Sequence, residues 1–207
     1  MRPKIRILTV DEHPILREGI AAVHETEDDM DLVAEASDGS EALNQFRAHL
    51  PDVTLMDLQM PQMNGIDAIL AIRKDFPDAR IIVLTTYSGD AQAAKAFKAG
   101  ASGYLLKNML RKELVETIRS VHAGKKRIPT EIAVGMAEHL AQDALTEREI
   151  QVLRQVAAGN ANKVIADHLS LSEETIKAHM KNILSKLDAN DRTHAVTIAL
   201  RRGIIEI

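Results

Sequence analysis

Short apolar runs alternate with longer amphipathic stretches through residues 1–124, and this alternation constrains the fold more than any other feature. Five runs rich in Val, Ile and Leu read as strands buried on both faces: Ile5–Val10, Leu32–Ala36, Val53–Met56, Ile81–Leu84 and Gly103–Leu106. Five stretches of helical length follow them: Pro14–Glu25, Ser40–His49, Gly65–Asp75, Asp90–Ala99 and Arg111–Ala123. Because parallel strands need crossover helices, residues 1–124 are predicted to form a doubly wound, five-stranded parallel α/β domain.

The pattern changes after Gly124. Residues 125–143 begin with the basic, proline-marked stretch Lys125–Pro129, and Thr130–Asp143 has helical character without strand partners. We interpret this segment as a partly helical linker and its basic cluster as a solvated charge run. Residues 144–207 are predicted to form an all-helical domain of four short helices. These helices are expected from Thr146 to Ala158, from Asn162 to His168, after Ser172, and from Arg192 to Arg202.

Composition and charge exclude several classes of function. The chain has no Cys, which excludes disulfides, Cys-ligated zinc and iron–sulfur clusters. Aromatic residues make up only 2% of the chain, which argues against a base-stacking platform for single-stranded nucleic acid. No apolar run is long enough to span a bilayer, and no signal peptide is evident, so a soluble, cytoplasmic protein is expected.

The net charge of −4 is shared evenly along the chain. Seventeen basic and 19 acidic residues precede Ile128, and 9 basic and 11 acidic residues follow it. Neither part is broadly basic. Any binding to nucleic acid must therefore use a local patch.

Polar residues follow four of the five expected strands, at the edge where an open α/β sheet binds its ligands. They are Asp11 and Glu12 after the first run, Asp57 after the third, Thr85 after the fourth and Lys107 after the fifth. Three carboxylates at one edge would repel each other unless a cation lay between them, and Mg²⁺ prefers such oxygen ligands. One carboxylate can then attack a phosphoryl donor while the hydroxyl and the ammonium stabilise the transferred group.

Four segments resemble the receiver domain of bacterial two-component response regulators, by their sequence and their joint spacing. They are Asp11-Glu12-His13-Pro14, Asp57–Pro61 with Asn64-Gly65, Leu84-Thr85-Thr86, and Gly103–Lys107. The resemblance implies a flavodoxin-like receiver domain. Together with the helical domain, it indicates the NarL/FixJ class of transcriptional regulators over essentially the whole chain.

The resemblance also implies a role for each matching residue. Asp57 is the expected acceptor of phosphate from a sensor histidine kinase, and Thr85 and Lys107 are expected to bind the phosphoryl group. Tyr104 is the expected switch aromatic, which turns inward when Thr85 moves. The expected ligands of Mg²⁺, or of Mn²⁺ in its place, are Asp11, Glu12, Asp57 and the backbone carbonyl of Gln59. Beyond its own phosphorylation and slow dephosphorylation, the chain is not expected to be an enzyme.

The acidic pair departs from the receiver pattern, in which it is usually Asp-Asp or Glu-Asp. The extra methylene of Glu12 displaces its carboxylate, and Mg²⁺ tolerates little departure from octahedral geometry. His13 follows the pair, but one His beside two carboxylates is not specific for a metal. We therefore interpret His13 as a loop-packing residue.

The third helix of the C-terminal domain has two distinct faces. Apolar residues at helical spacing predict its core-facing side: Ile176, Met180, Ile183, Leu184 and Leu187. The opposite side carries small and cationic residues, and Lys177 lies at its edge. The short helix and the four-residue connector before it indicate a helix-turn-helix in which this helix reads DNA.

The stretch Leu145–Ile205 resembles the LuxR-type DNA-binding module, on the pattern Leu145–Glu149, Gly159, Asn162-Lys163, Ile165-Ala166, Leu169, Thr175–Lys177, His179 and Lys186-Leu187. The resemblance implies base contacts by Lys177, Ala178 and Lys181, and phosphate contacts by Asn162, Lys163 and Thr175. It implies dimerisation through Ala195, Val196, Ile198 and Ala199. The expected partners are the kinase, double-stranded promoter DNA, a second copy of the chain and, as a further candidate, RNA polymerase, but no membrane.

Two rival functions stay open at this point. The first is a DNA-binding protein that does not depend on phosphorylation, whose receiver serves only for dimerisation or sensing. The second is a metal-dependent phosphohydrolase, although the sequence offers no dedicated general acid. A phosphate-binding loop of the P-loop type is absent from the sequence, which disfavours hydrolysis of nucleoside triphosphates.

Overall fold

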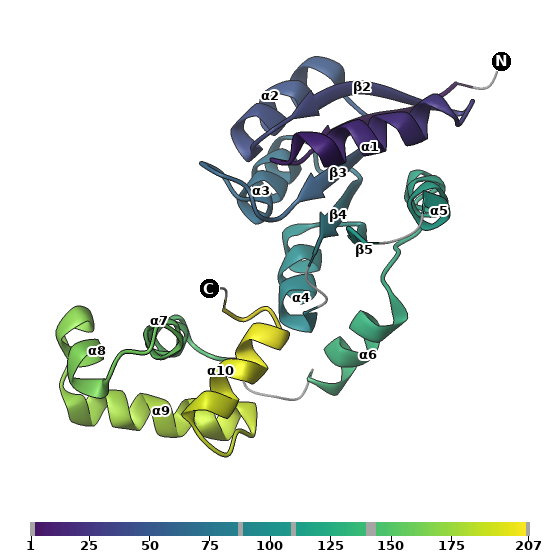
Figure 1. The fold of residues 1–207 in the computed structure, drawn as a ribbon. Helices are drawn as coiled ribbons and strands as arrows, with labels where there is room; N and C mark the ends of the chain where they lie inside the picture. The colour runs from purple at the N-terminus through teal and green to yellow at the C-terminus, as the bar shows by residue number, and fades with distance from the viewer. Residues whose placement is uncertain (1–2, 87–88, 109–110, 140–143, 206–207) are drawn as a thin grey trace. The chain divides into compact units, whose positions relative to one another are not determined.

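The computed structural model describes residues 3–86, 89–108, 111–139 and 144–205, and the side chains of residues 24–25 are not described. The chain forms two compact units. The first contains the sheet and ends at Thr130, and the second is formed mainly by the residues that follow (Figure 1). None of the helices in the described part of the chain is both long and apolar enough to cross a membrane.

The first unit is a five-stranded parallel sheet with helices between its strands, as predicted. The strands are β1 (Ile5–Val10), β2 (Met30–Ala36), β3 (Val53–Asp57), β4 (Ile81–Thr85) and β5 (Gly103–Leu106), in the spatial order β2-β1-β3-β4-β5. The helices are α1 (Pro14–Glu25), α2 (Gly39–His49), α3 (Gly65–Asp75), α4 (Asp90–Ala99) and α5 (Arg111–His122). The strand order reverses between β1 and β3, where a doubly wound sheet opens a ligand crevice at its carboxyl edge.

Both faces of the sheet are buried, which explains why its strands read as unbroken apolar runs. On one face Ile7, Leu55 and Ile82 share a core with Ile118 of α5 and Ile20 of α1. The residues that alternate with them along the strands are also buried, and they lie on the opposite face.

The segment after α5 is only partly the solvated linker that the sequence predicts. The side chains of Lys125, Lys126 and Arg127 are exposed. The backbone of Arg127, however, pairs in parallel with the edge of β5, because its N–H donates to Ser102 O at 3.1 Å and its carbonyl accepts from Tyr104 N at 3.0 Å. Helix α6 (Thr130–Glu138) follows. The rest of the predicted helix, at residues 140–143, lies outside the described residues.

The second unit contains α7 (Glu147–Ala157), α8 (Asn162–Leu169), α9 (Glu173–Leu187) and α10 (Arg192–Arg201). The predicted capping box at the start of α7 is confirmed: Glu149 N donates to Thr146 Oγ1 at 3.3 Å, and Thr146 N donates to Glu149 Oε2 at 2.8 Å. Ser172 caps α9 by accepting from Thr175 N at 3.1 Å. The four helices share one aliphatic core, to which α9 contributes Ile176, Ile183 and Leu187.

Candidate functional site

Two carboxylates and one ammonium meet at the carboxyl edge of the sheet. Asp11 follows β1, Asp57 ends β3, and both side chains are buried, with 0% and 3% of their area exposed. Lys107, just after β5, bridges them: its Nζ lies 2.6 Å from Asp57 Oδ2 and 2.8 Å from Asp11 Oδ2. Residues 11, 57 and 107, far apart in the sequence, therefore share one site at the point where the strand order reverses.

The electrostatics of the site are unfavourable for the negative charge on Asp57. Burial raises the pKa of the Asp57 carboxyl and the neighbouring Asp11 raises it further, while the hydrogen bond from Lys107 lowers it only in part. Burial alone would lower the pKa of Lys107, but its contacts with Asp11 and Asp57 raise that pKa overall. One ammonium therefore does not fully compensate two buried carboxylates, and a divalent cation would complete the neutralisation.

The backbone around Asp57 leaves no room for larger side chains. Gly65, the first residue of α3, donates its N–H to Leu58 O at 3.0 Å. A Cβ atom added at Gly65 would lie 2.0 Å from the carbonyl oxygen of Asp57, far inside contact distance. Gln59 N donates to Asp57 Oδ1 at 3.2 Å. The loop after β3 therefore depends on a glycine at position 65.

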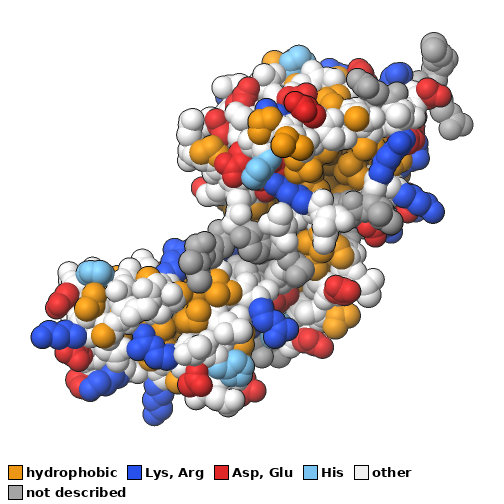
Figure 2. All heavy atoms as spheres, in the orientation of Figure 1, with side chains coloured by type: hydrophobic (Ala, Val, Ile, Leu, Met, Phe, Trp, Pro, Cys, Tyr) orange, Lys and Arg blue, Asp and Glu red, His pale blue; other side chains and the backbone are white. Residues whose placement is uncertain are grey.

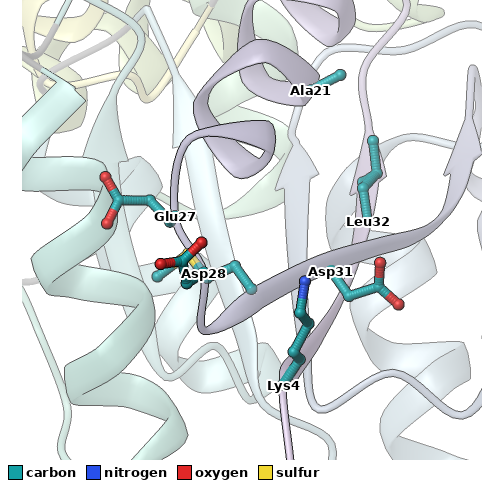
Figure 3. A pocket seen from close by; sticks show the side chains of 7 residues that line it. Lys4, Ala21, Glu27, Asp28, Asp31 and Leu32 are labelled. Carbon is teal, nitrogen blue, oxygen red and sulfur yellow. The ribbon is translucent and has the colours of Figure 1, made fainter.

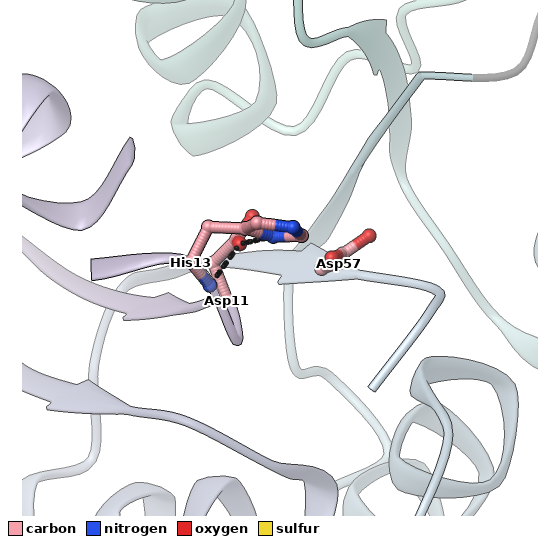
Figure 4. A group of neighbouring side chains, drawn as sticks. All are labelled: Asp11, His13 and Asp57. Carbon is pink, nitrogen blue, oxygen red and sulfur yellow. Dashed lines mark hydrogen bonds and ion pairs between the residues drawn. The ribbon is translucent and has the colours of Figure 1, made fainter. Parts of the chain in front are cut away.

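The residues beside Asp11 differ from the sequence interpretation in their orientation. Glu12, the predicted second acidic ligand, has an exposed side chain. His13 instead turns to Asp11, and its backbone N and its ring Nδ1 lie 2.9 Å and 3.0 Å from Asp11 Oδ1. Figure 4 shows the ring beside Asp11, on the same side as Asp57. One ligand atom each of Asp11, His13 and Asp57 lies within 4.8 Å of the other two.

Thr85 and Tyr104 lie together on neighbouring strands. Both side chains are buried, and the Thr85 hydroxyl is hydrogen-bonded to the Tyr104 phenol. Burial raises the pKa of the Tyr104 phenol, and this hydrogen bond opposes the shift. Tyr104 therefore already faces inward while its phenol is bonded to Thr85, whereas the sequence interpretation has it turn inward only when Thr85 moves. Through its backbone, the same residue also pairs with Arg127.

The second unit presents the predicted DNA-reading residues on its surface. Lys177, Ala178 and Lys181 are exposed on α9, on the side away from its core residues. Lys177 Nζ forms an ion pair with Glu174 Oε1 at 2.7 Å. Of the predicted phosphate contacts, Lys163 is exposed, whereas Asn162 and Thr175 are half-buried. Basic side chains are interspersed with acidic ones on the face shown in Figure 2, in keeping with the even charge balance.

Two of the four predicted dimerisation residues of α10 do not face outward. Ala195 and Ala199 are fully buried in the core of the helical unit, whereas Val196 and Ile198 are half-buried. A stripe of small residues along a short helix indicates one packed face, and here that face packs on the chain's own helices. The two alanines therefore offer no side-chain surface to a second copy.

Sequence reasoning missed the partner of Glu149. Its side chain is 4% exposed, and Oε2 accepts from Lys186 Nζ at 2.9 Å as well as from Thr146 N and Thr146 Oγ1. Burial tends to raise the pKa of Glu149, but these hydrogen bonds lower it overall. The pair ties α7 to α9. The capping box pointed to Glu149, and Lys186 belongs to the LuxR-type pattern, but nothing in the sequence identified Lys186 as the partner of Glu149.

A separate pocket lies at the opposite edge of the sheet, where β1 and β2 begin. It is lined by Lys4, Ala21, Glu27, Asp28, Met30, Asp31 and Leu32 (Figure 3). Hydrogen bonds from Arg111 and Arg119 lower the pKa of Glu27 and bind this turn to α5. Glu27 is thus paired with two arginines of α5, and the amino edge of such a sheet is not where ligands bind. We therefore assign no site to this pocket.

Two family models match the chain. The response regulator receiver domain matches residues 7–119, and the luxR family of bacterial regulatory proteins matches residues 143–199. The boundary between the two matches falls in the predicted linker.

Relatives match over nearly the whole length. The "uncharacterized transcriptional regulatory protein YhcZ" of Bacillus subtilis is 40% identical, over 97% of each chain. The transcriptional regulatory protein LiaR of the same organism is 38% identical, over 97% of this chain and 99% of the relative. A solved complex of the two-component response regulator RcsB with DNA has a TM-score of 0.71 at 26% identity, covering 96% of this chain and 98% of that one.

Proposed function

Because the chain belongs to the NarL/LuxR class of two-component response regulators, we propose that phosphorylation of Asp57 by a sensor histidine kinase switches its binding to promoter DNA. The observation that carries this proposal is the pair of buried carboxylates, Asp11 and Asp57, bridged by Lys107 at the carboxyl edge of the sheet. A buried ion pair of this kind often costs stability. Buried carboxylates with perturbed pKa values are found preferentially at functional sites. Transfer of a phosphoryl group to Asp57 is the function that uses all three residues.

Each residue of the site has a task in phosphoryl transfer. An oxygen of Asp57 forms the new bond to phosphorus while the bond from phosphorus to the donor nitrogen breaks. Lys107 and Thr85 then bind the phosphoryl oxygens. The carboxylates of Asp11 and Asp57 supply the hard oxygen ligands that suit Mg²⁺, with Glu12 and the carbonyl of Gln59 as further predicted ligands. Bound Mg²⁺ would neutralise charge on the carboxylates and on the incoming phosphoryl group.

The hydrogen bonds around Tyr104 suggest how the site signals outward. Thr85 contacts the Tyr104 side chain, and the Tyr104 backbone pairs with Arg127, just before α6. When Thr85 turns to bind a phosphoryl oxygen, its bond to Tyr104 is lost. The edge of β5, and with it the start of the linker, responds to that loss. The linker thereby reports the state of Asp57 to the residues that follow it.

The second unit supplies the output. Lys177, Ala178 and Lys181 of α9 enter the major groove and contact base edges, while Lys163, Asn162 and Thr175 position the unit on phosphates. Because the domain carries few cations, one copy binds weakly. Two copies on paired half-sites bind more tightly through their effective concentration. A cytoplasmic location follows from this function, with RNA polymerase as a further candidate partner.

The first test is covalent labelling. The full chain is incubated with a small phosphodonor and Mg²⁺, and its phosphorylated fraction is measured by Phos-tag electrophoresis. Wild type and the control Asp78→Ala, at an exposed aspartate, are expected to be labelled, and Asp57→Ala is expected not to be. Equal labelling of Asp57→Ala would refute the assignment of the acceptor.

The second test separates the switch from its rival. Genomic binding profiles of the wild type and of Asp57→Ala are compared under conditions in which the wild type is phosphorylated. Loss of sites in the variant supports control by phosphorylation. Identical profiles would identify a regulator that binds DNA irrespective of Asp57, with a receiver used for dimerisation or sensing.

A further inference from the structure

We propose that His13 is a ligand of the divalent ion at the phosphorylation site, and that its imidazole makes the site prefer Mn²⁺ to Mg²⁺. This inference rests on the proposed function only for the location of the ion. It replaces the loop-packing role inferred for His13 from the sequence.

The position of the His13 ring is the first argument. Its Nδ1 lies 3.0 Å from Asp11 Oδ1. Two neighbouring ligands on an octahedral ion with bonds of about 2.1 Å are about 3.0 Å apart, so the two atoms already have the separation of adjacent ligands. Asp57 completes the group, because one ligand atom each of Asp11, His13 and Asp57 lies within 4.8 Å of the other two.

The backbone that carries the ring is held in place by hydrogen bonds, while the side chain itself is 62% exposed. His13 N donates to Asp11 Oδ1 at 2.9 Å, so the backbone turns directly back on the carboxylate. Arg17 Nη1 donates to the Asp11 carbonyl at 2.6 Å and restrains the same turn from the other side. When the ring proton is on Nε2, the lone pair of Nδ1 is free to bind a cation, and the contact with Asp11 Oδ1 is then no hydrogen bond. The backbone bond to Oδ1 persists, so Asp11 keeps its orientation.

The charge of the site is the second argument. Asp11 and Asp57 carry two negative charges, and Lys107 neutralises one of them. A third carboxylate would favour a hard ion such as Mg²⁺ through charge alone. Glu12 and His13 are both exposed, but His13 is the one whose ring nitrogen contacts Asp11, and it offers a neutral nitrogen as a further donor. Imidazole suits first-row transition ions, which bind nitrogen more strongly than Mg²⁺ does, and carboxylates also suit Mn²⁺.

The test uses tag-free, unphosphorylated full-length protein with Mn²⁺ as the probe. Pulsed electron paramagnetic resonance detects the ¹⁴N nucleus of a ligated imidazole directly. We expect a ¹⁴N coupling in the wild type and in the control His122→Ala, which removes an exposed histidine at the end of α5. The coupling is expected to vanish in His13→Phe and in His13→Gln. The ratio of Mn²⁺ affinity to Mg²⁺ affinity should fall on the order of tenfold in both variants.

The outcomes separate two roles for His13, and they also separate this proposal from the proposed function. Absence of ¹⁴N coupling in the wild type overturns the proposal whether or not a variant folds, and leaves His13 as a residue that only orients Asp11. Coupling that persists in both His13 variants overturns it as well. Failure of Asp57 labelling with saturating Mg²⁺ would overturn the proposed function alone, because the Mn²⁺ spectra do not depend on phosphorylation.

Discussion

Each of the two units contains a buried carboxylate that is paired with a lysine, yet the pKa shifts of the two carboxyls have opposite signs. In the helical unit, three hydrogen bonds from Thr146 and Lys186 lower the pKa of Glu149. In the receiver unit, the pKa of Asp57 is raised because burial and the adjacent Asp11 outweigh the contact with Lys107.

The difference lies in how fully each charge is compensated. Glu149 is surrounded by donors, so its charge stabilises the junction of α7 and α9. Asp57 has one ammonium that it shares with Asp11, and one long backbone hydrogen bond. A carboxylate left in this state suits the proposed uptake of a cation and a phosphoryl group. Unfavourable electrostatics therefore mark the functional site, and favourable electrostatics mark the structural one.

The largest effect is expected from removing the lysine of the receiver site. Lys107→Met leaves two buried carboxylates facing each other without a cation, and should lower the free energy of unfolding of this unit by about 3–5 kcal/mol. Urea unfolding followed by NMR signals of receiver residues measures the change. Lys112→Met, at a lysine whose side chain is 85% exposed, is the control. Adding Asp11→Asn to Lys107→Met should recover much of the loss, and no recovery would contradict the electrostatic explanation.

A smaller loss is expected in the helical unit. Glu149→Ala removes the capping-box carboxylate and leaves Lys186 without its buried partner, which should cost about 2 kcal/mol in the unfolding of this unit. Glu147→Ala removes an exposed acidic residue from the same helical turn and is the matched control. Thermal unfolding of both variants checks the difference. Equal midpoints would mean that the pair contributes nothing to the fold.

The sequence predicted those parts of the molecule that periodicity and strand ends determine. The strands ending at Asp57 and Thr85 were evident because runs covered on both faces are uniformly apolar, and their carboxyl edges must meet. The direction of the His13 ring was not evident from the sequence. A single loop turn determines it, and loops have no hydrophobic periodicity from which a side-chain direction could be predicted. The pairing of Arg127 with β5 was missed for a related reason: it uses backbone groups, which every residue possesses.

A gain in stability is expected where the charge itself is unfavourable. Because the folded pKa of Asp57 is raised, its proton favours folding at pH values below the unfolded pKa of about 3.9, and this contribution is lost as the pH rises through the folded pKa. At neutral pH the ionised carboxylate therefore destabilises the fold. Asp57→Asn, which cannot ionise, should raise the stability of the receiver unit on the order of 1 kcal/mol at pH 7.

The pH profile distinguishes this explanation from simple repacking. The advantage of Asp57→Asn should fall as the pH drops through the folded pKa and disappear by about pH 3, where Asp57 is protonated in both states. Glu149 behaves in the opposite way: its contribution is present above its unfolded pKa of about 4.5 and is lost as the pH falls through the lowered folded pKa. Residue-resolved unfolding of the full chain between pH 3 and 8, at roughly unit steps, measures both profiles. If the difference in unfolding free energy between Asp57→Asn and the wild type does not change with pH, the pKa argument is contradicted.

The smallest effect is expected at a third carboxylate–lysine pair, which supplies the baseline for the other two. Glu174 and Lys177 form a contact of 2.7 Å on α9, but their side chains are 81% and 57% exposed. Glu174 raises the pKa of Lys177, yet water and salt screen an exposed pair, so Lys177→Ala should leave the unfolding midpoint of the helical unit unchanged. Lys177→Ala should weaken only the binding of DNA. Fluorescence anisotropy with promoter fragments recovered from the genomic profiles measures this affinity. A clear loss of stability in Lys177→Ala would mean that exposure does not separate binding groups from structural ones in this unit.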